Sequence, residues 1–351
     1  MKDLSNDIAK QIHDAYQSKN ALCIEGGNSK RFIGREIQGD TLSLRNHIGI
    51  IEYEPSELYI TARSGTSLIN IENEIANNNQ ILPFEPPHFS SAATVGGMIA
   101  TGLSGPRRMS HGSVRDCILG VEIISGKGEI LRFGGKVMKN VAGYDVSRLM
   151  CGAYGSLGAI VTISVRLMPK PECENTIVVL LTYLDAIKKM NDLANAPFPI
   201  TANFYDGNAL YIRISGSKSA VNECSKIIGG DTLENDESFW ISIREQTHEF
   251  FNTEMPLWRI SVPSNTPKLN IDGHCAMEWN GALRWYKSEM RADALRNIVS
   301  QAGGHAHLFR GNSIDDIFHP LDKTTHKLNQ SLKQVFDPAN ILNPGKMYAD
   351  I

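Results

Sequence analysis

The sequence predicts an α+β fold in two domains, and three observations support this prediction. The chain has 351 residues, whereas a typical single domain has about 100–150. Short apolar strands bounded by glycine and proline dominate the first half, and strands alternate with longer helical patterns in the second half. Pro169-Lys170-Pro171 ends a long strand and marks a boundary. We predict a first domain over residues 1–171, a smaller second domain over 172–330, and a C-terminal segment over 331–351 that docks.

The elements of the first domain are predicted from short local patterns. A strand over Ala21–Glu25 ends at a pair of glycines, and strands over Ile48–Tyr53 and Leu58–Ala62 flank a turn sequence. The further predicted elements are a helix from Ser67 to about Asn77, a hairpin of strands Ile118–Ser125 and Glu129–Phe133 around Gly126-Lys127-Gly128, and a long strand over Ala159–Met168.

The second domain is predicted from strands that alternate with helical segments. The predicted strands are Leu210–Ser215, Trp258–Val262, Cys275–Trp279 and His305–Phe309. The predicted helices are Ala220–Ile228, Glu234–Asn252 and Ser288–Gln301. Such an α+β layer is typical of an antiparallel sheet with helices on one face. The turn-rich, apolar segment Val335–Met347 follows and is expected to pack on the protein.

Composition excludes several classes of protein. The formal net charge is -3, with 42% hydrophobic and 21% charged residues, so nothing favours nucleic-acid binding. The N-terminus lacks the apolar core of a signal peptide, and the apolar runs are too short to span a membrane. We expect a soluble, cytoplasmic protein, with at most a peripheral association with the inner membrane. The six cysteines form no CxxC pair, so neither a zinc site nor an iron–sulfur ligand set is predicted.

Glycines cluster unusually between Glu85 and Pro171. Glycine costs about 0.5–1 kcal/mol relative to alanine inside a regular element, so clusters between apolar segments indicate close backbone approach to a bulky group. Small hydroxyl residues accompany the glycines, and bare amides beside hydroxyls suit a pyrophosphate. A loop-rich domain with tight turns is the simpler alternative. The clusters contain Gly96, Gly97, Gly102, Gly105, Gly112, Gly152, Gly155 and Gly158, with Ser90, Ser91, Thr94, Thr101 and Ser104.

Two common nucleotide-binding motifs are absent from the sequence. No GxGxxG follows a buried strand, and no GxxxxGK[ST] occurs, so neither a Rossmann unit nor a P-loop is predicted. Any dinucleotide must therefore bind to another scaffold.

Three motifs resemble the FAD-binding domain shared by vanillyl-alcohol oxidase and p-cresol methylhydroxylase. They are Gly26-Gly27-Asn28-Ser29, Thr94-Val95-Gly96-Gly97 and Asn140-Val141-Ala142-Gly143-Tyr144-Asp145. The resemblance covers about Ala21 to Pro171 and includes the C-terminal Ile-Leu-Asn-Pro-Gly-Lys, which is similar to the segment that returns to the FAD domain in this family. It implies a two-part FAD-binding domain of the p-cresol methylhydroxylase type, followed by an α+β cap domain with an antiparallel sheet.

The resemblance also implies which residues hold the cofactor. The first loop would give amides to the FAD pyrophosphate, the second segment would line the opposite side and the flavin edge, and a third would lie against adenine or ribose. For the third, a turn between a helix and a strand is an equal alternative. The residues are Gly26, Gly27, Asn28 and Ser29; Thr94, Val95, Gly96, Gly97, Thr101, Ser104 and Gly105; and Gly158, Ala159 and Ile160.

The first loop departs from one pattern of the family. Some relatives attach FAD covalently to a histidine in this loop, whereas this chain has Asn28 and Ser29 there. We therefore expect FAD to be bound without a covalent link.

Several charged residues near the glycines have two interpretations. Arg107, Arg108 and Arg115 could bind phosphate through their guanidinium groups, or could pair with Asp116 or Glu122. His88 and His111 are more typical of hydrogen-bonded structural residues than of catalytic bases.

The catalytic residues are unknown from the sequence, and the second domain offers only weak candidates. A 2-hydroxy acid needs a cation for its carboxylate and a base near its hydroxyl. The candidates are Arg213, Arg259 and Arg284, with His305 and His307 on one face of a predicted strand. For the histidines, packing beneath a helix or exposure at a sheet edge is the favoured alternative. The arginines could equally be strand residues that face solvent. No metal-ligand set is predicted.

Within the family, the run from Gly96 to Ile160 is similar to the FAD-binding subunits of bacterial glycolate oxidases. This resemblance implies a complex that oxidises glycolate to glyoxylate and passes electrons to a non-NAD acceptor. The implied partners are a larger FAD-containing catalytic subunit and an iron–sulfur subunit. The alternatives are a stand-alone FAD-dependent dehydrogenase of a small 2-hydroxy acid such as lactate, and a non-redox binding protein.

Four tryptophans occur in the predicted second domain. They could mark a partner interface, where tryptophan is enriched, but core packing is the default expectation. They are Trp240, Trp258, Trp279 and Trp285.

Overall fold

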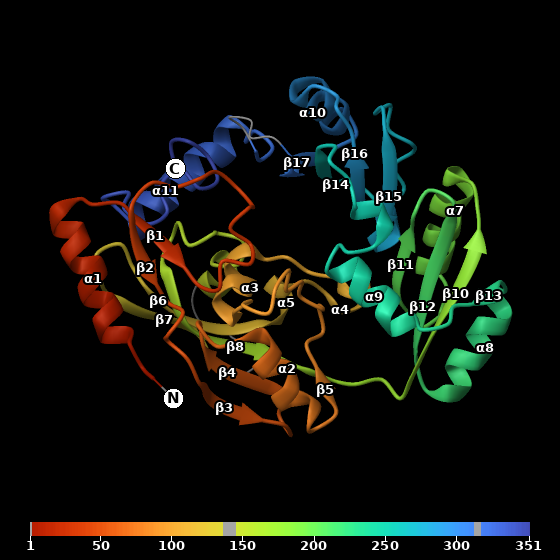
Figure 1. The fold of residues 1–351 in the computed structure, drawn as a ribbon, viewed down its shortest axis with the longest axis horizontal. Coiled ribbons are helices and arrows are strands. Elements are labelled where there is room, and N and C mark those ends of the chain that lie inside the picture. The colour runs from red at the N-terminus through yellow and green to blue at the C-terminus, as the bar shows by residue number, and fades with distance from the viewer. Residues whose placement is uncertain (1, 136–144, 312–316) are drawn as a thin grey trace. The chain divides into compact units, whose positions relative to one another are not determined.

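The computed structural model describes residues 2–135, 145–311 and 317–351 (Figure 1). Contacts divide the chain into two compact units. The first unit comprises Met1–Ser104, Gly112–Lys170 and Pro320–Ile351, and the second unit comprises Gly105–His111 and Pro171–His319. The change of unit after Lys170 falls within the predicted proline boundary. By contrast, residues 105–111 belong to the second unit and residues 320–330 to the first.

An antiparallel sheet of five strands forms the centre of the first unit, in the order β3-β4-β8-β6-β7 (Figure 1). The central strand β8 is buried on both faces, because Ile163 packs into one hydrophobic core and Val161 into another. This explains its nearly continuous apolar sequence. The strands are β3 (Ile50–Glu54), β4 (Tyr59–Arg63), β6 (Ile118–Ile124), β7 (Ile130–Gly134) and β8 (Ala159–Arg166).

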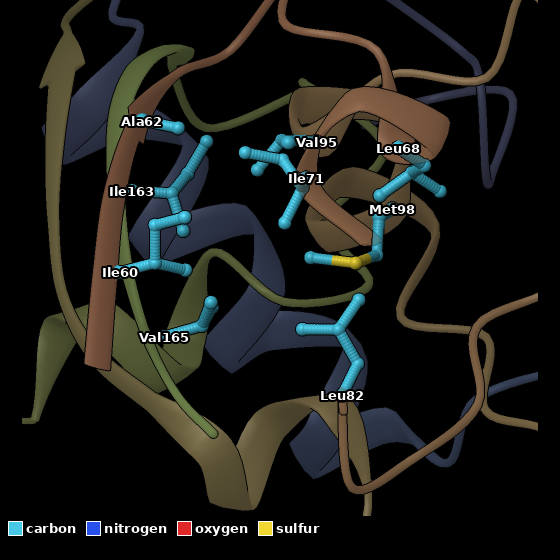
Figure 2. Close-up of a pocket in the computed structure, with 9 residues that line it drawn as sticks. All are labelled: Ile60, Ala62, Leu68, Ile71, Leu82, Val95, Met98, Ile163 and Val165. Atoms are coloured by element: carbon cyan, nitrogen blue, oxygen red, sulfur yellow. The ribbon is translucent and has the colours of Figure 1, made fainter. Parts of the chain in front are cut away.

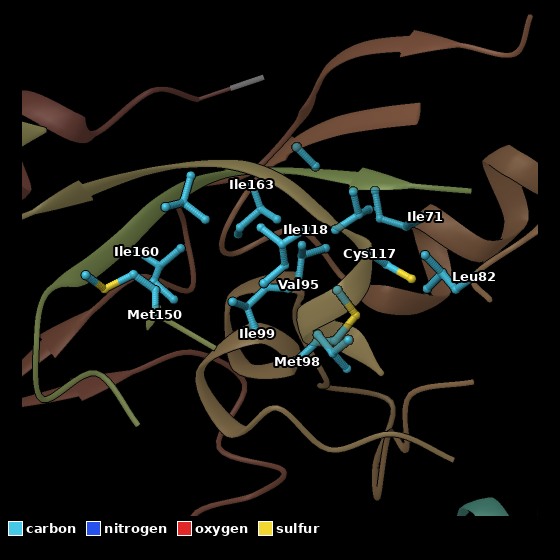
Figure 3. Packing of buried hydrophobic residues seen from close by; sticks show 14 of the residues in the cluster. Ile71, Leu82, Val95, Met98, Ile99, Cys117, Ile118, Met150, Ile160 and Ile163 are labelled. Carbon is cyan, nitrogen blue, oxygen red and sulfur yellow. The ribbon is translucent and has the colours of Figure 1, made fainter. Parts of the chain in front are cut away.

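Two helices cover one face of this sheet and build its larger core (Figure 3). They are α2 (Leu68–Ala76) and α3 (Val95–Thr101), whose apolar residues recur at helical spacing. Thr94 begins α3 by accepting a hydrogen bond from the Gly97 amide through its hydroxyl, at 3.2 Å. A small cavity in this core is lined entirely by apolar side chains from both helices and the sheet (Figure 2). It is a packing gap and offers no polar group to a ligand.

The other face of the sheet is covered by the N-terminal and C-terminal parts of the chain. Helix α1 (Ser5–Ser18) packs there, together with the parallel strand pair β1 (Leu22–Glu25) and β2 (Asp40–Ser43). The C-terminal helix α11 (Lys323–Phe336) is followed by residues 337–351, whose Ile341 and Leu342 are buried in this core. The C-terminal segment therefore packs on the first unit.

Short elements complete the first unit, and the second unit begins within the glycine-rich region. The short strands β5 (Gln80–Ile81) and β9 (Met168–Pro169) pair with each other, and the helices α5 (Val114–Cys117) and α6 (Val146–Leu149) have four residues each. The helix α4 (Arg108–His111) belongs to the second unit. No helix among the described residues is long and apolar enough to cross a bilayer.

The second unit is built on one antiparallel sheet of eight strands, in the order β13-β10-β12-β11-β15-β16-β14-β17 (Figure 1). The antiparallel sheet agrees with the sequence prediction. The strands are β10 (Cys173–Leu180), β11 (Ile200–Tyr205), β12 (Ala209–Gly216), β13 (Asp231–Thr232), β14 (Leu257–Ser261), β15 (His274–Glu278), β16 (Leu283–Lys287) and β17 (His305–Arg310). The helices are α7 (Tyr183–Ala194), α8 (Lys218–Ile228), α9 (Asp236–Arg244), α10 (Ala292–Gln301), η1 (Glu249–Phe251) and η2 (Trp279–Gly281).

The helices lie on both faces of this sheet, so the expectation of one covered face is wrong. Adjacent residues of β11 show this, because neighbouring side chains of a strand point to opposite faces. Tyr205 meets Tyr183 of α7 at 6.2 Å between ring centroids, whereas Phe204 meets Phe239 of α9 at 6.2 Å. The predicted helix over Glu234–Asn252 is also shorter, because α9 ends before Gln246, whose φ is 55°.

Candidate functional site

Two loops of the first unit approach each other at their glycines. The first loop follows β1 and contains Gly26 and Gly27, and the second contains Ala92 and Thr94. A Cβ added to Gly27 would lie 1.5 Å from the Ala92 carbonyl oxygen, and one added to Gly26 would lie 2.7 Å from Thr94 Oγ1. Both distances are shorter than a real Cβ contact, so only glycine fits. The backbone of the first loop therefore lies directly against the second loop at these two glycines.

The first loop presents a row of backbone N–H groups. The amides of four successive residues, Gly26, Gly27, Asn28 and Ser29, have no hydrogen-bond acceptor within the part of the chain that the structure describes. Asn28 has a φ of 59°, the left-handed conformation that occurs in anion-binding backbone nests. A row of successive amides whose N–H groups are not used within the described protein is suited to an anion such as phosphate.

A buried lysine lies in the same loop, and sequence reasoning misses it. Lys30 is 8% exposed, and its Nζ lies 3.4 Å from Ser29 Oγ and 3.3 Å from the carbonyl oxygen of His88. Its positive charge therefore lies beside the row of amides, where it would stabilise an anion. Its position directly after the glycine loop is the only signal in the sequence. Arg31, the next residue, instead pairs with Glu25 at 2.9 Å.

The second segment is held against the sheet by its glycines. A Cβ on Gly96 would lie 2.8 Å from the Cβ of Ser64, so the backbone of α3 lies directly on the end of β4. The Gly96 amide donates to the Ser64 carbonyl at 2.8 Å, while Val95 is buried in the core. The Thr101 hydroxyl donates to the Gly97 carbonyl at 2.8 Å. Among the predicted residues here, Thr94 and Thr101 therefore use their hydroxyls within α3.

The other predicted cofactor residues have different surroundings. Ser104 Oγ accepts a hydrogen bond from the Val114 amide at 3.0 Å, in the first unit. Gly105 belongs to the second unit, where its carbonyl oxygen accepts from Trp279 Nε1 at 3.1 Å. Gly158 precedes β8, in which Ala159 and Ile160 are buried core residues that pair with β6. These two residues can offer only backbone to a ligand.

Arg107 and Arg108 are used inside the second unit. Arg107 is 2% exposed, and its Nη2 donates to Glu174 Oε1 at 2.7 Å. The guanidinium of Arg108 lies over the ring of Trp279 at 4.3 Å. Arg107 is therefore ion-paired, as one of the two interpretations proposes, but with Glu174 instead of the expected carboxylates.

The remaining charged residues near the glycines have local partners or lie in solvent. Arg115 is exposed, Asp116 caps the Ser113 amide, and Glu122 pairs with Arg132. His88 Nε2 lies 3.1 Å from Glu72 Oε1, and His111 Nδ1 lies 2.7 Å from Ser110 Oγ. Both histidines thus have the hydrogen-bonded environment that the sequence favours.

Two candidate catalytic residues lie side by side on the second sheet. Arg259 of β14 is directly opposite His307 of β17 in the antiparallel register. Arg259 also lies over Trp279, with 5.3 Å between its guanidinium carbon and the ring centroid. Burial and the charge of Arg259 lower the pKa of His307 well below its usual value, and the same two causes lower the pKa of His305. His307 is therefore a neutral imidazole, and its Nε2 has no hydrogen-bond partner among the residues that the structure describes.

Arg284 and Arg213 have structural environments instead. Arg284 is completely buried, and its guanidinium donates to the carbonyls of Gly281, Pro267 and Thr266 and to Tyr183 Oη. Arg213 is 3% exposed and lies over Trp240 at 5.0 Å. We therefore place both arginines outside the proposed substrate site.

The four tryptophans of the second unit are all buried, at 3–7% exposure, which matches the default expectation of core packing. The third sequence motif lies mostly outside the described residues. Of Asn140–Asp145, only Asp145 is described, and it caps α6 through the Arg148 amide at 3.3 Å.

The residues of the first unit fit the phosphate part of FAD. Four amides without acceptors, a buried lysine beside them and a backbone contact that excludes side chains form a site for a phosphate anion. No histidine occurs in the first loop, so nothing there could form a covalent link to flavin through a histidine.

Comparison with known proteins agrees with this site. Residues 5–134 match the family model of the FAD binding domain, and residues 319–347 match that of the C-terminal domain of FAD linked oxidases. Glycolate oxidase subunit GlcE of Escherichia coli (strain K12) is 44% identical over 349 residues, which cover 99% of each chain. Glycolate oxidase subunit GlcD of Bacillus subtilis (strain 168) is 32% identical over 178 residues, or 50% of this chain and 38% of that protein.

A solved structure shows the same fold. The structure of p-cresol methylhydroxylase with substrate bound has a TM-score of 0.70 at 16% identity, covering 99% of this chain and 87% of that one. The p-cresol methylhydroxylase-type fold expected from the sequence is thus confirmed. By its sequence and its fold, the chain belongs to the FAD-linked oxidase family, together with the glycolate oxidase subunit GlcE.

Proposed function

We propose that this chain is the FAD-binding subunit of a complex that oxidises glycolate to glyoxylate and passes the electrons to an acceptor other than NAD. The observation that carries the proposal is the row of four amides without acceptors, beside the buried Lys30. The 44% identity to a glycolate oxidase subunit along almost the whole chain supports the choice of complex.

The residues of the first unit would hold FAD without a covalent bond. Gly26, Gly27, Asn28 and Ser29 would donate amides to the diphosphate, and Lys30 would balance part of its charge. Within the first unit, the segment from Thr94 to Ser104 would lie along the flavin edge, and the backbone of Gly158–Ile160 would lie against the adenosine. FAD, when bound, supplies the two-electron redox chemistry.

The chain would work with other subunits. A larger FAD-containing subunit would carry the oxidation of the hydroxy acid, and an iron–sulfur subunit would receive the electrons. The names of the two glycolate oxidase relatives, which are both subunits, support an assembly of this kind.

Co-purification with flavin analysis tests the proposal. A tagged chain should carry yellow FAD that acid or detergent releases, and should recover two partner subunits. Anaerobic glycolate should leave the flavin of the isolated chain oxidised and should bleach it once the partners are added. A well-folded chain that is colourless and takes up no FAD would overturn the proposal, and so would a flavin peptide that survives denaturing electrophoresis.

A second function is favoured by the pair of Arg259 and His307. In a stand-alone dehydrogenase of a small 2-hydroxy acid such as lactate, the guanidinium would bind the carboxylate and the neutral imidazole would accept the hydroxyl proton. This function predicts that lactate or glycolate bleaches the isolated chain. It also predicts that Arg259→Lys slows the bleaching, while the same change at the exposed Arg291 does not.

A further inference from the structure

The C-terminal segment pairs with the strand that leads into the first glycine loop. The Leu22 amide of β1 donates to the Ile341 carbonyl at 2.7 Å, and the Asn343 amide donates to the Leu22 carbonyl at 3.0 Å. Residues 341–343 therefore lie along β1. Leu22, which pairs with Leu342, precedes the first loop glycine, Gly26, by four residues. A segment more than three hundred residues away in the chain thus supports the start of the proposed FAD site.

The side chain of Asn343 connects β1 to a second part of that site. Its Oδ1 accepts from the Ile24 amide at 2.7 Å, and its Nδ2 donates to the Tyr154 carbonyl at 2.6 Å. Ile24 lies two residues before Gly26, and Tyr154 lies in the turn that leads to Gly158. Asn343 is 5% exposed, so both bonds are shielded from water. One carboxamide therefore joins the segment that leads to the proposed diphosphate site and the segment that leads to the proposed adenosine site.

The residues around Asn343 fix the turn that receives its carboxamide. A Cβ on Gly155 would lie 2.8 Å from Asn343 Nδ2, and Gly155 has a φ of 75°, so the turn needs glycine to admit the carboxamide. Lys333 fixes the same turn from the other side, because its Nζ donates to the Ser156 carbonyl at 2.8 Å and to the Leu342 carbonyl at 2.7 Å. Its ion pair with Asp337, at 2.9 Å, is buried.

We propose that Asn343 is a positioning residue for FAD, which sets the spacing between the first glycine loop and the Tyr154–Gly158 turn. The inference rests on the proposed FAD site. The carboxamide is required because one end must accept and the other must donate. An aspartate would still accept from Ile24 but could not donate to Tyr154 when ionised, and would place a negative charge against that carbonyl.

The test is the affinity of the apo-protein for FAD, which is measured through the quenching of flavin fluorescence on binding. Asn343→Asp should raise the dissociation constant about tenfold, since a buried acceptor loses its donor. Asn340→Asp is the matched control, because Asn340 also has a positive φ, of 50°, but is exposed. Ile12→Val is the stability control, because it weakens the same unit from α1 and removes no hydrogen bond of Asn343. Both controls should bind FAD like the wild type.

A pH series separates positioning from general destabilisation. Protonation of the introduced aspartate restores a donor, so the ratio of the variant's dissociation constant to that of the wild type should shrink as the pH falls from 8 towards 5. If Asn343→Asp does not fold, Asn343→Ser removes the bridge without a charge and should give the same loss. A folded variant that binds FAD like the wild type would overturn the inference, and so would a loss that Ile12→Val reproduces. A wild-type chain that binds no FAD would instead refute the proposed function.

Discussion

Two sets of hydrogen-bond donors, one in each unit, differ in whether the protein supplies their acceptors. In the first unit, the amides of Gly26–Ser29 have no acceptor in the described part of the chain, although they lie beside a buried lysine. In the second unit, the buried Arg107 and Arg284 donate to Glu174 and to a set of carbonyls. Donors that have no acceptor within the protein are available to a ligand, whereas donors that bond to acceptors of the protein stabilise the fold. The comparison therefore supports the proposal that FAD binds to the first unit.

The largest effect is expected from Gly27→Ala, which tests the ligand side of this comparison. The new Cβ would lie 1.5 Å from the Ala92 carbonyl oxygen, so one loop must move and the row of amides is lost. We expect FAD affinity to fall at least about 100-fold, or roughly 2.7 kcal/mol, in an equilibrium titration. Gly135→Ala is the control, because no atom of the residues that the structure describes lies within 4 Å of its added Cβ. Unchanged binding in Gly27→Ala would show that the loop contact has no role in the site.

Arg284→Met tests whether the buried guanidinium of the second unit stabilises the fold. Removal of the guanidinium leaves the buried carbonyls of Gly281 and Pro267 without their donor, so we expect a loss of about 3 kcal/mol in the free energy of unfolding. Denaturant unfolding would measure it, and Arg291→Met at an exposed position is the control. FAD affinity of the folded variant should stay unchanged. A variant as stable as the wild type would contradict the assignment of Arg284 to the fold.

Two neighbouring cations sharpen the comparison within the first loop. Lys30 is 8% exposed beside the amides, whereas the Arg31 side chain is 57% exposed and pairs with Glu25. Lys30→Met should weaken FAD binding about tenfold, since a partly desolvated charge interacts strongly with an anion. Arg31→Met should weaken it less than about threefold, because water and salt screen exposed charges. Isothermal titration calorimetry at two salt concentrations would measure the FAD affinity of both variants. Equal losses of affinity would contradict a role for Lys30 in the site.

The smallest effect is expected from pH and concerns a buried histidine of the first unit. His47 Nδ1 accepts from the Leu4 amide at 3.0 Å, and Nε2 lies 3.0 Å from the Val161 carbonyl. Burial lowers the pKa of His47 in the folded protein below its unfolded value of 6.5, so its contribution is complete above pH 6.5 and is lost as the pH falls below that value. Thermal unfolding between pH 5 and 8 should show this loss, and His47→Gln should reduce it. An equal slope in the variant would exclude His47 as its source.

The sequence predicts what short stretches of chain determine. The hairpin around Gly126–Gly128 and the helix that begins after Ser67 form as expected, because their turn and cap residues are local. The glycine clusters between Glu85 and Pro171 are evident from composition, whereas the loop of Gly26 and Gly27 is identified only through the family resemblance. The family resemblance then adds the identity of the cofactor, which the glycines alone leave open.

The rest depends on contacts between distant residues, which a sequence pattern does not contain. Arg107 meets Glu174 across 67 positions, and Asn343 meets Ile24 across 319. Likewise, the face of the second sheet that α9 covers follows from packing of Phe239 on Phe204, not from the helical pattern of α9 itself. For Lys30, the sequence shows a charge next to a loop, and only its burial distinguishes it from Arg31.

The pairing of β1 with residues 341–343 also constrains the order in which the two units can be completed during synthesis on the ribosome. Most of the second unit is one continuous stretch, 171–319, which is complete while the last part of the chain is still being translated. In the first unit, strand β1 is among the first residues to be synthesised. Residues 341–343, which pair with β1, are among the last dozen. A nascent chain halted before residue 341 would therefore contain every residue of the second unit but would lack the segment that pairs with β1 in the first unit.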